Sequence, residues 1–549
     1  MASSHHQPAG TTINDLPNEL LDRIVSSFAT SQDPEGKHVD KDYVYSIWHQ
    51  NRPTLRSLVL VSKRFRHIAE AHLYAAFCYD VHRQKLRRFV QTLLARPSLA
   101  RHVKLVYLES WSGEAMPFEG DSWRATAEKA GFEGEERSRF MADMSKGSLF
   151  ADVILLLTVA THLAVLDIEI PYEPMSWIRP FLLRQARIQR ALGPEPEGPL
   201  HRLQHVELWH EDTEGGFHPD AIAEFLHLPS LRHVTAFMCA GGPRSDGDDD
   251  DAAEEDDDEG ARPNTAVWPE PGTSSVTSVS LVESLVTPAA VGHLLSRSTA
   301  VKSFEYCLGS AVVGHDDLPV ADLWPHLYAV GHSLEALTID SAEHALWSTL
   351  HGETSPPPLC LALRRFPRLK RLAVSQAFLL PASGLHDAEE EGEEQEQEDP
   401  DDHERRDDTT SRAVVVVVVV PLAPAPGAYR RIVEEDLPAS LESLAMLGAQ
   451  MGHENRLDLL CFLRLLLRPS VPPHGSGDSG STGDQSSGSG TSSTHALLLP
   501  RLRTIDITRA VATRVGRPAP ARSVFGVSCA RHTDETKGMF ERCGVEFLA

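Results

Sequence analysis

The segment Leu163-Ala164-Val165-Leu166-Asp167-Ile168 carries a pattern that recurs along most of this 549-residue chain. A leucine is followed three residues later by an apolar residue, and by another two residues further on. This spacing predicts a turn that leads into a short strand with inward-facing side chains. The other copies are Leu203-Val206-Leu208, Leu231-Val234-Ala236, Val301-Phe304-Tyr306, Leu334-Leu337-Ile339, Leu369-Leu372-Val374, Leu441-Leu444-Ala445-Leu447 and Leu502-Ile505-Ile507, with a poorer copy at Leu99-Val103-Leu105-Leu108.

Helix-like apolar runs precede several copies and end at a proline. One run, residues 222–226, lies before Pro229, and another, residues 361–366, lies before Pro367. Each unit is therefore predicted to be a helix, a loop and a strand. Because no such unit buries its apolar face alone, the units must stack. The predicted fold class is α/β, with a curved parallel sheet and a last strand or cap near Met539–Phe547.

Two stretches near the amino terminus predict helices. Residues 15–24, Asp-Leu-Pro-Asn-Glu-Leu-Leu-Asp-Arg-Ile, place Pro17 where a first helical residue is expected. The apolar residues that follow lie on one helical face: Leu20, Leu21, Ile24, Val25 and Phe28. The second stretch predicts a further helical face, formed by Leu58, Val61, Phe65, Ile68 and His72.

Together these stretches resemble the F-box, the short helical module that binds substrate receptors to the Skp-type adaptor of cullin–RING ubiquitin ligases. The resemblance covers residues 13–77, and it implies adaptor contacts for Leu16, Pro17, Leu20, Ile24, Leu58, Val61 and Phe65. The segment between the halves, residues 31–53, is longer than the usual link. The spacing of Tyr43, Val44, Ile47 and Trp48 predicts that this segment adds a helix or covers the module. The alternative is an ordinary helix pair whose apolar faces fill a core.

The units after residue 77 resemble the irregular leucine-rich repeats that follow the F-box in many fungal F-box proteins. Spacings between successive leucines include 28, 33, 35 and 40 residues, and the asparagine ladder of regular repeats is missing. The resemblance implies a repeat solenoid over residues 78–549 that binds a protein. Trp209, Tyr306 and Trp347 are candidate anchors for such a partner, because large aromatic side chains dominate interface hot spots.

The net charge of −26 is concentrated in two acidic runs. Residues 246–259 contribute −11 and residues 387–408 contribute −12, so the rest of the chain carries only −3. Self-repelling or Gly/Ser-rich composition predicts disorder in the inserts 241–275, 382–412 and 469–494, and in residues 1–12. The inserts fall between strand patterns, which favours the repeat interpretation.

Composition also bounds the partners and the compartment. No basic stripe is visible in the sequence, so we expect no nucleic-acid partner. The seven cysteines are scattered and form no Cys-x-x-Cys pair, which is typical of a reducing compartment. No secretory signal and no apolar run long enough for a bilayer is found. We therefore expect a cytoplasmic or nuclear protein without a membrane partner.

Motifs for catalysis, metals and cofactors are weak. The sequence has neither a phosphate-binding glycine loop nor a His-Glu-x-x-His motif, and we expect no cofactor. Residues 331–335, Gly-His-Ser-Leu-Glu, begin like a lipase nucleophile elbow around Ser333, but Glu335 replaces the second glycine. His201 and His205 would be neighbours on a helix, yet the surrounding pattern predicts that a strand begins between them.

The sequence thus predicts a non-catalytic substrate receptor of a Skp–cullin–F-box ubiquitin ligase. Its partners would be the Skp-type adaptor, the cullin scaffold and an unidentified protein substrate. Holding that substrate beside a charged conjugating enzyme would make ubiquitin transfer nearly intramolecular. The alternative is a leucine-rich protein-interaction scaffold without ligase association. An enzyme built around Ser333 is the remaining hypothesis.

Overall fold

The computed structural model describes residues 13–29, 41–79, 83–109, 123–170, 177–193, 198–210, 216–241, 267–309, 322–341, 363, 365–375, 441, 443–447, 467–469, 495–497, 504–506, 537 and 546–548. The chain divides into unit 1, Met1–Val301 with Gly309–His315, and unit 2, Lys302–Leu308 with Asp316–Ala549. Trp347, the acidic runs and the first twelve residues lie outside the described residues.

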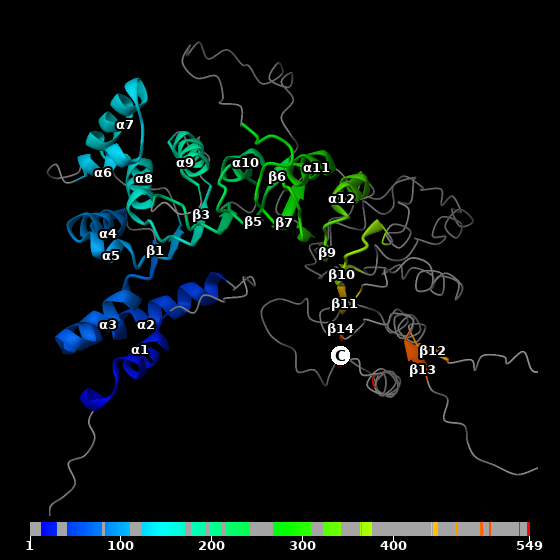
Figure 1. The fold of residues 1–549 in the computed structure, drawn as a ribbon, viewed down its shortest axis with the longest axis horizontal. Coiled ribbons are helices and arrows are strands. Elements are labelled where there is room, and N and C mark those ends of the chain that lie inside the picture. The colour runs from blue at the N-terminus through cyan, green and yellow to red at the C-terminus, as the bar shows by residue number, and fades with distance from the viewer. Residues whose placement is uncertain are drawn as a thin grey trace, which may run out of the picture. The chain divides into compact units, whose positions relative to one another are not determined.

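Unit 1 alternates helices with short strands (Figure 1). Its helices are α1 (Asn18–Ser26), α2 (Lys41–Val61), α3 (Lys63–Leu73), α4 (Arg83–Ala95), α5 (Pro97–Ala100), α6 (Arg124–Lys129), α7 (Gly134–Lys146), α8 (Leu149–Val159), α9 (Ile178–Leu192), α10 (Asp220–Phe225) and α11 (Pro288–Ser296). Its strands are β1 (Ala76–Tyr79), β2 (Leu105–Leu108), β3 (Val165–Glu169), β4 (His205–Trp209), β5 (His233–Phe237), β6 (Ala240–Gly241) and β7 (Ser278–Val286).

The strands of unit 1 form a parallel sheet in the order β1-β2-β3-β4-β5-β7, with β6 beside the end of β7. Helices connect most neighbouring strands: α4 and α5 join β1 to β2, α6 to α8 join β2 to β3, and α9 and α10 make the next two connections. The prediction of an α/β fold built from helix, loop and parallel strand is therefore confirmed.

The recurring sequence pattern accounts for the core of this sheet. Its three positions become three rows of side chains that are at most 3% exposed. The turn row is Val103, Leu163, Leu203, Leu231 and Val276. The two strand rows are Val106, Leu166, Val206, Val234 and Val279, followed by Leu108, Ile168, Leu208, Ala236 and Leu281. The parallel register aligns these rows, so each unit completes the core of the next.

One ion pair lies inside this helical layer. The Arg87 guanidinium on α4 and the Asp152 carboxylate on α8 are 2.6 Å apart, and both side chains are almost completely buried. The guanidinium nitrogen of this contact, Nη2, also donates to the second carboxylate oxygen at 2.8 Å, and Nε of Arg87 donates to that oxygen at 3.0 Å. These contacts compensate for the free-energy cost of removing both charges from water. They also join α4, which precedes β2 in the chain, to α8, which follows it.

Unit 2 continues the same pattern with shorter described segments. It contains β8 (Ser303–Leu308), α12 (Leu323–Val330), β9 (Ala336–Ser341), β10 (Arg371–Ser375), β11 (Ser443–Leu447), β14 (Thr504–Asp506) and β15 (Glu546–Leu548). These strands pair in parallel in that order. A separate antiparallel pair, β12 (Leu467–Pro469) and β13 (His495–Leu497), flanks the predicted Gly/Ser insert. β15 is the strand predicted at the carboxyl terminus.

The segment 267–275, which we predicted to end the first acidic insert, is part of the described fold of unit 1. The Trp268 indole donates to the Asp220 carboxylate at 2.9 Å, and the Gly272 amide donates to the Ser296 carbonyl at 2.9 Å. Ser274 is buried and forms a β-bridge with Ser298. These contacts attach the segment to α10 and α11.

Candidate functional site

Helices α1, α2 and α3 form a helical module with its own apolar core. Its buried residues are Leu21, Val25, Leu55, Phe65, Ile68 and Ala69, and Leu16, Phe28, Leu58, Val59 and Leu73 pack around them. α1 supplies two of the buried residues, and α2 and α3 supply the others. The apolar faces predicted from both stretches therefore do contact one another.

The boundaries of these helices differ from the predictions in two places. Pro17 is the residue before the helix, with φ −54° and ψ 152°, and α1 begins at Asn18. The predicted second helical face is divided at Ser62, whose extended backbone separates α2 from α3. The Ser62 hydroxyl accepts the Phe65 amide at 3.2 Å, which satisfies a free donor at the start of α3.

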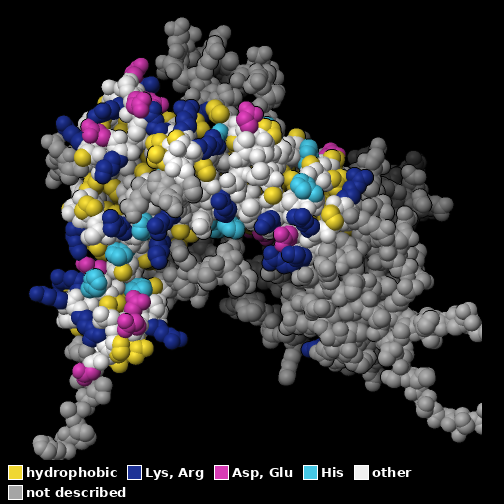
Figure 2. Space-filling model, in the orientation of Figure 1, with side chains coloured by type: hydrophobic (Ala, Val, Ile, Leu, Met, Phe, Trp, Pro, Cys, Tyr) yellow, Lys and Arg dark blue, Asp and Glu magenta, His cyan; other side chains and the backbone are white. Residues whose placement is uncertain are grey.

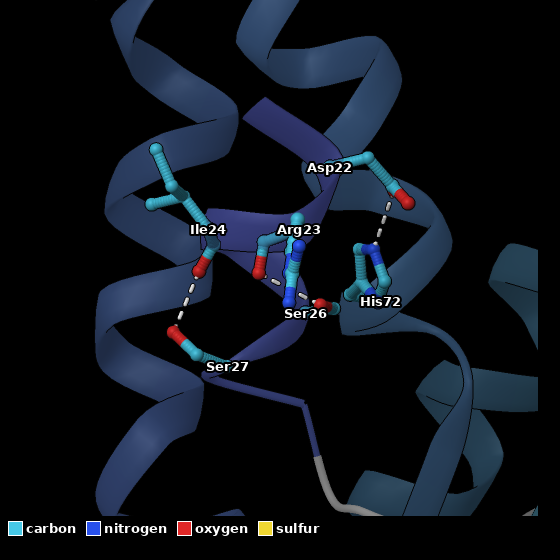
Figure 3. A network of polar contacts seen from close by, with 6 residues as sticks. All are labelled: Asp22, Arg23, Ile24, Ser26, Ser27 and His72. Carbon is cyan, nitrogen blue, oxygen red and sulfur yellow. Dashed lines mark hydrogen bonds and ion pairs between the residues drawn. The ribbon is translucent and has the colours of Figure 1, made fainter. Parts of the chain in front are cut away.

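Two polar links hold α1 against α3 at opposite ends. Near the start of α1, the Arg64 side chain donates to the Asn18 amide oxygen at 2.7 Å and to the Leu16 carbonyl. Further along, Asp22 and His72 are in contact at 2.9 Å (Figure 3). In Figure 3 the Ile24 side chain points away from this pair. The links fix α1 so that one of its sides faces outward.

The seven residues predicted to contact an adaptor do not share one environment. Leu20, Ile24 and Val61 are 46%, 44% and 64% exposed, and Pro17 is also exposed. Leu16 and Leu58 are partly buried. Phe65 is only 3% exposed and belongs to the core, so its ring is not accessible to a partner in this conformation.

Sequence reasoning missed one exposed apolar residue of the helical module, Leu60, which is 77% exposed in the last turn of α2. It precedes Val61 and the Ser62 cap, and Arg64 brings this junction to the start of α1. Leu60 does not belong to the three-and-four spacing of the predicted face. This departure from the spacing is the signal that could have identified Leu60 as an exposed residue. We call Leu20, Ile24, Leu60 and Val61 the apolar tip; Figure 2 shows hydrophobic side chains gathered over α1.

The first half of α2 extends from the helical module to the sheet. The Trp48 indole donates to the Ala76 carbonyl of β1 at 3.2 Å and packs with Cys78, Tyr107 and Trp209. The Arg52 guanidinium lies 4.4 Å from the centre of its ring. Part of the long segment 31–53 is thus helical and attaches the module to the sheet; residues 30–40 lie outside the described residues.

Two of the three candidate substrate anchors, Trp209 and Tyr306, are buried. Trp209 stacks on Tyr107 with ring centres 6.1 Å apart, and its indole donates to Asp167 at 2.8 Å. Tyr306 has no exposed surface and lies in the core of unit 2. Neither ring is accessible to a partner as it stands.

The Ser333 fragment does not have the geometry of a nucleophile elbow. An elbow leads from a strand into a helix, whereas Ser333 lies on a turn from α12 into β9. Its hydroxyl donates to the Val330 carbonyl at 3.0 Å, and the residue is 6% exposed. His201 and His205 are separated as predicted, because His205 begins β4. In the part of the chain that is described, His, Cys, Asp and Glu side chains form no group of three suited to a metal ion.

No protein-family model matches this chain, and no curated protein matches it either. Among the described residues, no helix is both long enough and apolar enough to cross a membrane.

Proposed function

We propose that this protein is the substrate-recognition subunit of a Skp–cullin–F-box ubiquitin ligase. The helical module is an F-box that binds the Skp-type adaptor, and through it the cullin. The helix–strand units are irregular leucine-rich repeats that bind a protein substrate. The protein carries out no chemistry itself, and it acts by raising the effective concentration of the substrate near the conjugating enzyme.

The observation that carries this proposal is the apolar tip. Leu20 and Ile24 are four residues apart on α1, so they lie on the same side of that helix. Leu60 and Val61 are exposed at the end of α2, although their neighbours Leu58 and Val59 pack around the module core. Complete burial of one such side chain contributes about 1.5–3 kcal/mol. Grouped exposed apolar residues on a small helical module are typical of a protein-binding site.

The position of Trp48 adds support. A receptor must hold its adaptor-binding module at a defined place relative to its substrate-binding surface. The Trp48–Ala76 hydrogen bond and the aromatic packing around it attach α2 to β1 directly. The described part of the segment between the F-box-like halves, residues 41–53, therefore has a structural role that is compatible with adaptor binding.

Co-purification with the Skp-type adaptor and cullin tests the proposal. The test variant is Leu20→Asp/Ile24→Asp, because both side chains are exposed and their replacement leaves the module core intact. The matched control is Leu192→Asp, which alters a 62% exposed leucine at the end of α9. We expect the wild type and the control to capture both proteins, and the double variant to capture at least tenfold less.

If folded wild-type protein captures neither adaptor nor cullin, the ligase assignment is refuted. The leucine-rich interaction scaffold without ligase association would then take its place. If the double variant captures both proteins as well as the wild type does, the helical module is not the binding site.

A further inference from the structure

The amino-terminal ends of the strands in unit 1 form an edge that is rich in basic residues. Five segments lead into strands there: 101–105, 161–165, 201–205, 229–233 and 274–278. Together they contain four Arg or Lys residues, five His residues and no Asp or Glu. The cations are Arg101, Lys104, Arg202 and Arg232, and the histidines are His102, His162, His201, His205 and His233. We call this set the basic edge.

Backbone hydrogen bonds establish that these segments are neighbours in space. The amide of Ala164 donates to the Lys104 carbonyl at 2.8 Å, and that of Gln204 donates to the Ala164 carbonyl at 2.9 Å. The Arg232 amide then donates to the Gln204 carbonyl at 2.9 Å. Lys104 and Arg232 are therefore equivalent residues, three strands apart. Figure 2 shows basic and histidine side chains gathered below the strands between α3 and β5.

Three of the four cations of the basic edge are accessible; the fourth, Arg232, is partly buried, and its guanidinium donates to the Pro229 and Leu231 carbonyls at 2.8 Å. Arg101, Lys104 and Arg202 are exposed, and within the described part of the chain their side chains make no hydrogen bond or ion pair.

The environment of the basic edge also lowers the pKa of two of its histidines. Burial lowers the pKa of His102, and the nearby His162, His67 and Lys104 lower it further, against the opposing effect of Glu70. Burial and then Arg232 lower the pKa of His233.

Acidic residues of the same strands lie further along, away from this edge. Asp167 and Glu169 occupy the third and fifth positions of β3, and Glu207 the third position of β4. These three are at most 8% exposed, and Glu283, the sixth residue of β7, is exposed. A ligand at the amino-terminal strand ends therefore meets Arg and Lys side chains, and the carboxylates of these strands lie further along the sheet.

We propose that the basic edge binds an extended, acidic polypeptide segment of a partner protein. Three strand spacings separate Lys104 from Arg232, about 14 Å, which matches four residues of an extended chain at about 3.4 Å each. Carboxylates on one side of such a segment would meet both cations. The inference is independent of the proposed ligase function, because none of these residues belongs to the helical module.

A nucleic acid fits this edge less well. The five segments contain no Phe, Tyr or Trp on which bases could stack. Only four of the nine basic residues carry a permanent charge, and a nucleic-acid site normally neutralises several phosphates with Lys and Arg. No basic stripe is visible along the sequence because these cations are spread over three separate turns. The register of the sheet brings the three turns to one edge, which corrects the expectation that the protein has no such stripe.

Fluorescence anisotropy with the full chain tests the proposal. The probe is a labelled 12-residue peptide of alternating Glu and Ser. The test variant is Arg101→Glu/Lys104→Glu/Arg202→Glu, and a second variant with Gln at the same positions guards against misfolding. The matched control, Lys129→Glu/Arg139→Glu/Lys146→Glu, makes the same change in charge on exposed residues of α6 and α7.

We expect the Glu variant to bind the peptide at least tenfold more weakly than wild type, the Gln variant to bind at intermediate strength, and the control to stay within twofold. Because the contacts are exposed ion pairs, added salt should weaken the wild-type complex. Absence of peptide binding by wild type, or equal losses in the test and control variants, would overturn the proposal. Tighter, edge-dependent binding of a 12-nucleotide single-stranded DNA would replace the peptide with a nucleic acid.

Discussion

At the scale of single residues, burial separates apolar side chains that maintain the helical module from those that a partner can reach. Phe65 is 3% exposed in the module core, whereas Leu60 is 77% exposed at the end of α2. Phe65→Ala leaves a cavity, and we expect it to lower the free energy of unfolding by about 3–5 kcal/mol. Leu60→Ala should change it by less than about 0.5 kcal/mol. Urea denaturation measures both, and similar losses for the two variants would contradict this arrangement.

A second residue-scale prediction concerns Glu224 on α10. Burial raises the pKa of this carboxyl from 4.5 to about 8, although Arg179 lies 3.8 Å away and opposes the shift. Between these two pH values the folded protein keeps a proton that the unfolded chain has lost. The stability contributed by this group is therefore fully present below pH 4.5, falls as the pH rises to about 8, and is constant above it.

Glu224→Gln should remove this part of the pH dependence, because the amide is neutral in both states. We expect the variant to gain stability relative to wild type as the pH rises from 5 to 8, as measured by thermal unfolding across that range. His227 provides the opposite trend as an internal comparison. Burial lowers the pKa of its imidazole, so its contribution is lost as the pH falls. An unchanged difference between Glu224→Gln and wild type at all pH values would show that the carboxyl is ionised when folded.

At the scale of elements, the parallel strands were largely predictable, because each unit places three apolar residues at fixed spacing against its helices. β7 was missed because Val276 directly follows the predicted insert 241–275, although Val276, Val279 and Leu281 keep the spacing. The division of α2 from α3 was missed for a different reason. The apolar spacing continues through Ser62, and only the capping hydroxyl interrupts the helix.

The candidate site was less predictable than the fold. Periodicity showed that α1 has an apolar face, but not that packing would bury Leu21 and leave Leu20 exposed. That division depends on where α2 and α3 lie, and the sequence does not encode it locally. The basic edge was not recognisable in the sequence for a similar reason, because strand register brings together residues from turns that are 28 or more positions apart.

The attachment of α2 to β1 gives an element-scale prediction. Trp48→Ala removes the hydrogen bond to the Ala76 carbonyl and the packing on Cys78, Tyr107 and Trp209. We expect amide hydrogens in the first half of α2 to exchange faster, while α3 keeps its protection, because the module core at Leu55 and Phe65 is untouched. Hydrogen exchange read by mass spectrometry distinguishes the two helices.

Trp268→Ala is the matched control for this experiment, since it removes another hydrogen-bonded indole from unit 1. Its effect should be confined to residues near 267–275 and α10. Equal loss of protection in α2 and α3 of the Trp48 variant would mean that the helical module unfolds as a whole. The role of Trp48 as a local attachment would then be wrong.

At the scale of the whole molecule, a receptor must do two things with separate surfaces. The apolar tip belongs to α1 and α2, whereas the basic edge and the strands belong to the helix–strand units. Leu20→Asp/Ile24→Asp should therefore reduce adaptor capture at least tenfold while it leaves substrate binding unchanged. If the proposed function holds, substrates bound to this variant escape ubiquitin transfer, because the conjugating enzyme is no longer brought near them.

The last prediction follows from that separation. In cells, proteins that co-purify with the wild type should co-purify in larger amounts with Leu20→Asp/Ile24→Asp, and the half-lives of these proteins should lengthen. Quantitative mass spectrometry of both purifications, followed by a chase after protein synthesis is blocked, measures the two effects. Leu192→Asp controls for the loss of an exposed leucine. Partners that gain neither abundance nor lifetime in the double variant would indicate a scaffold that holds proteins without delivering them for degradation.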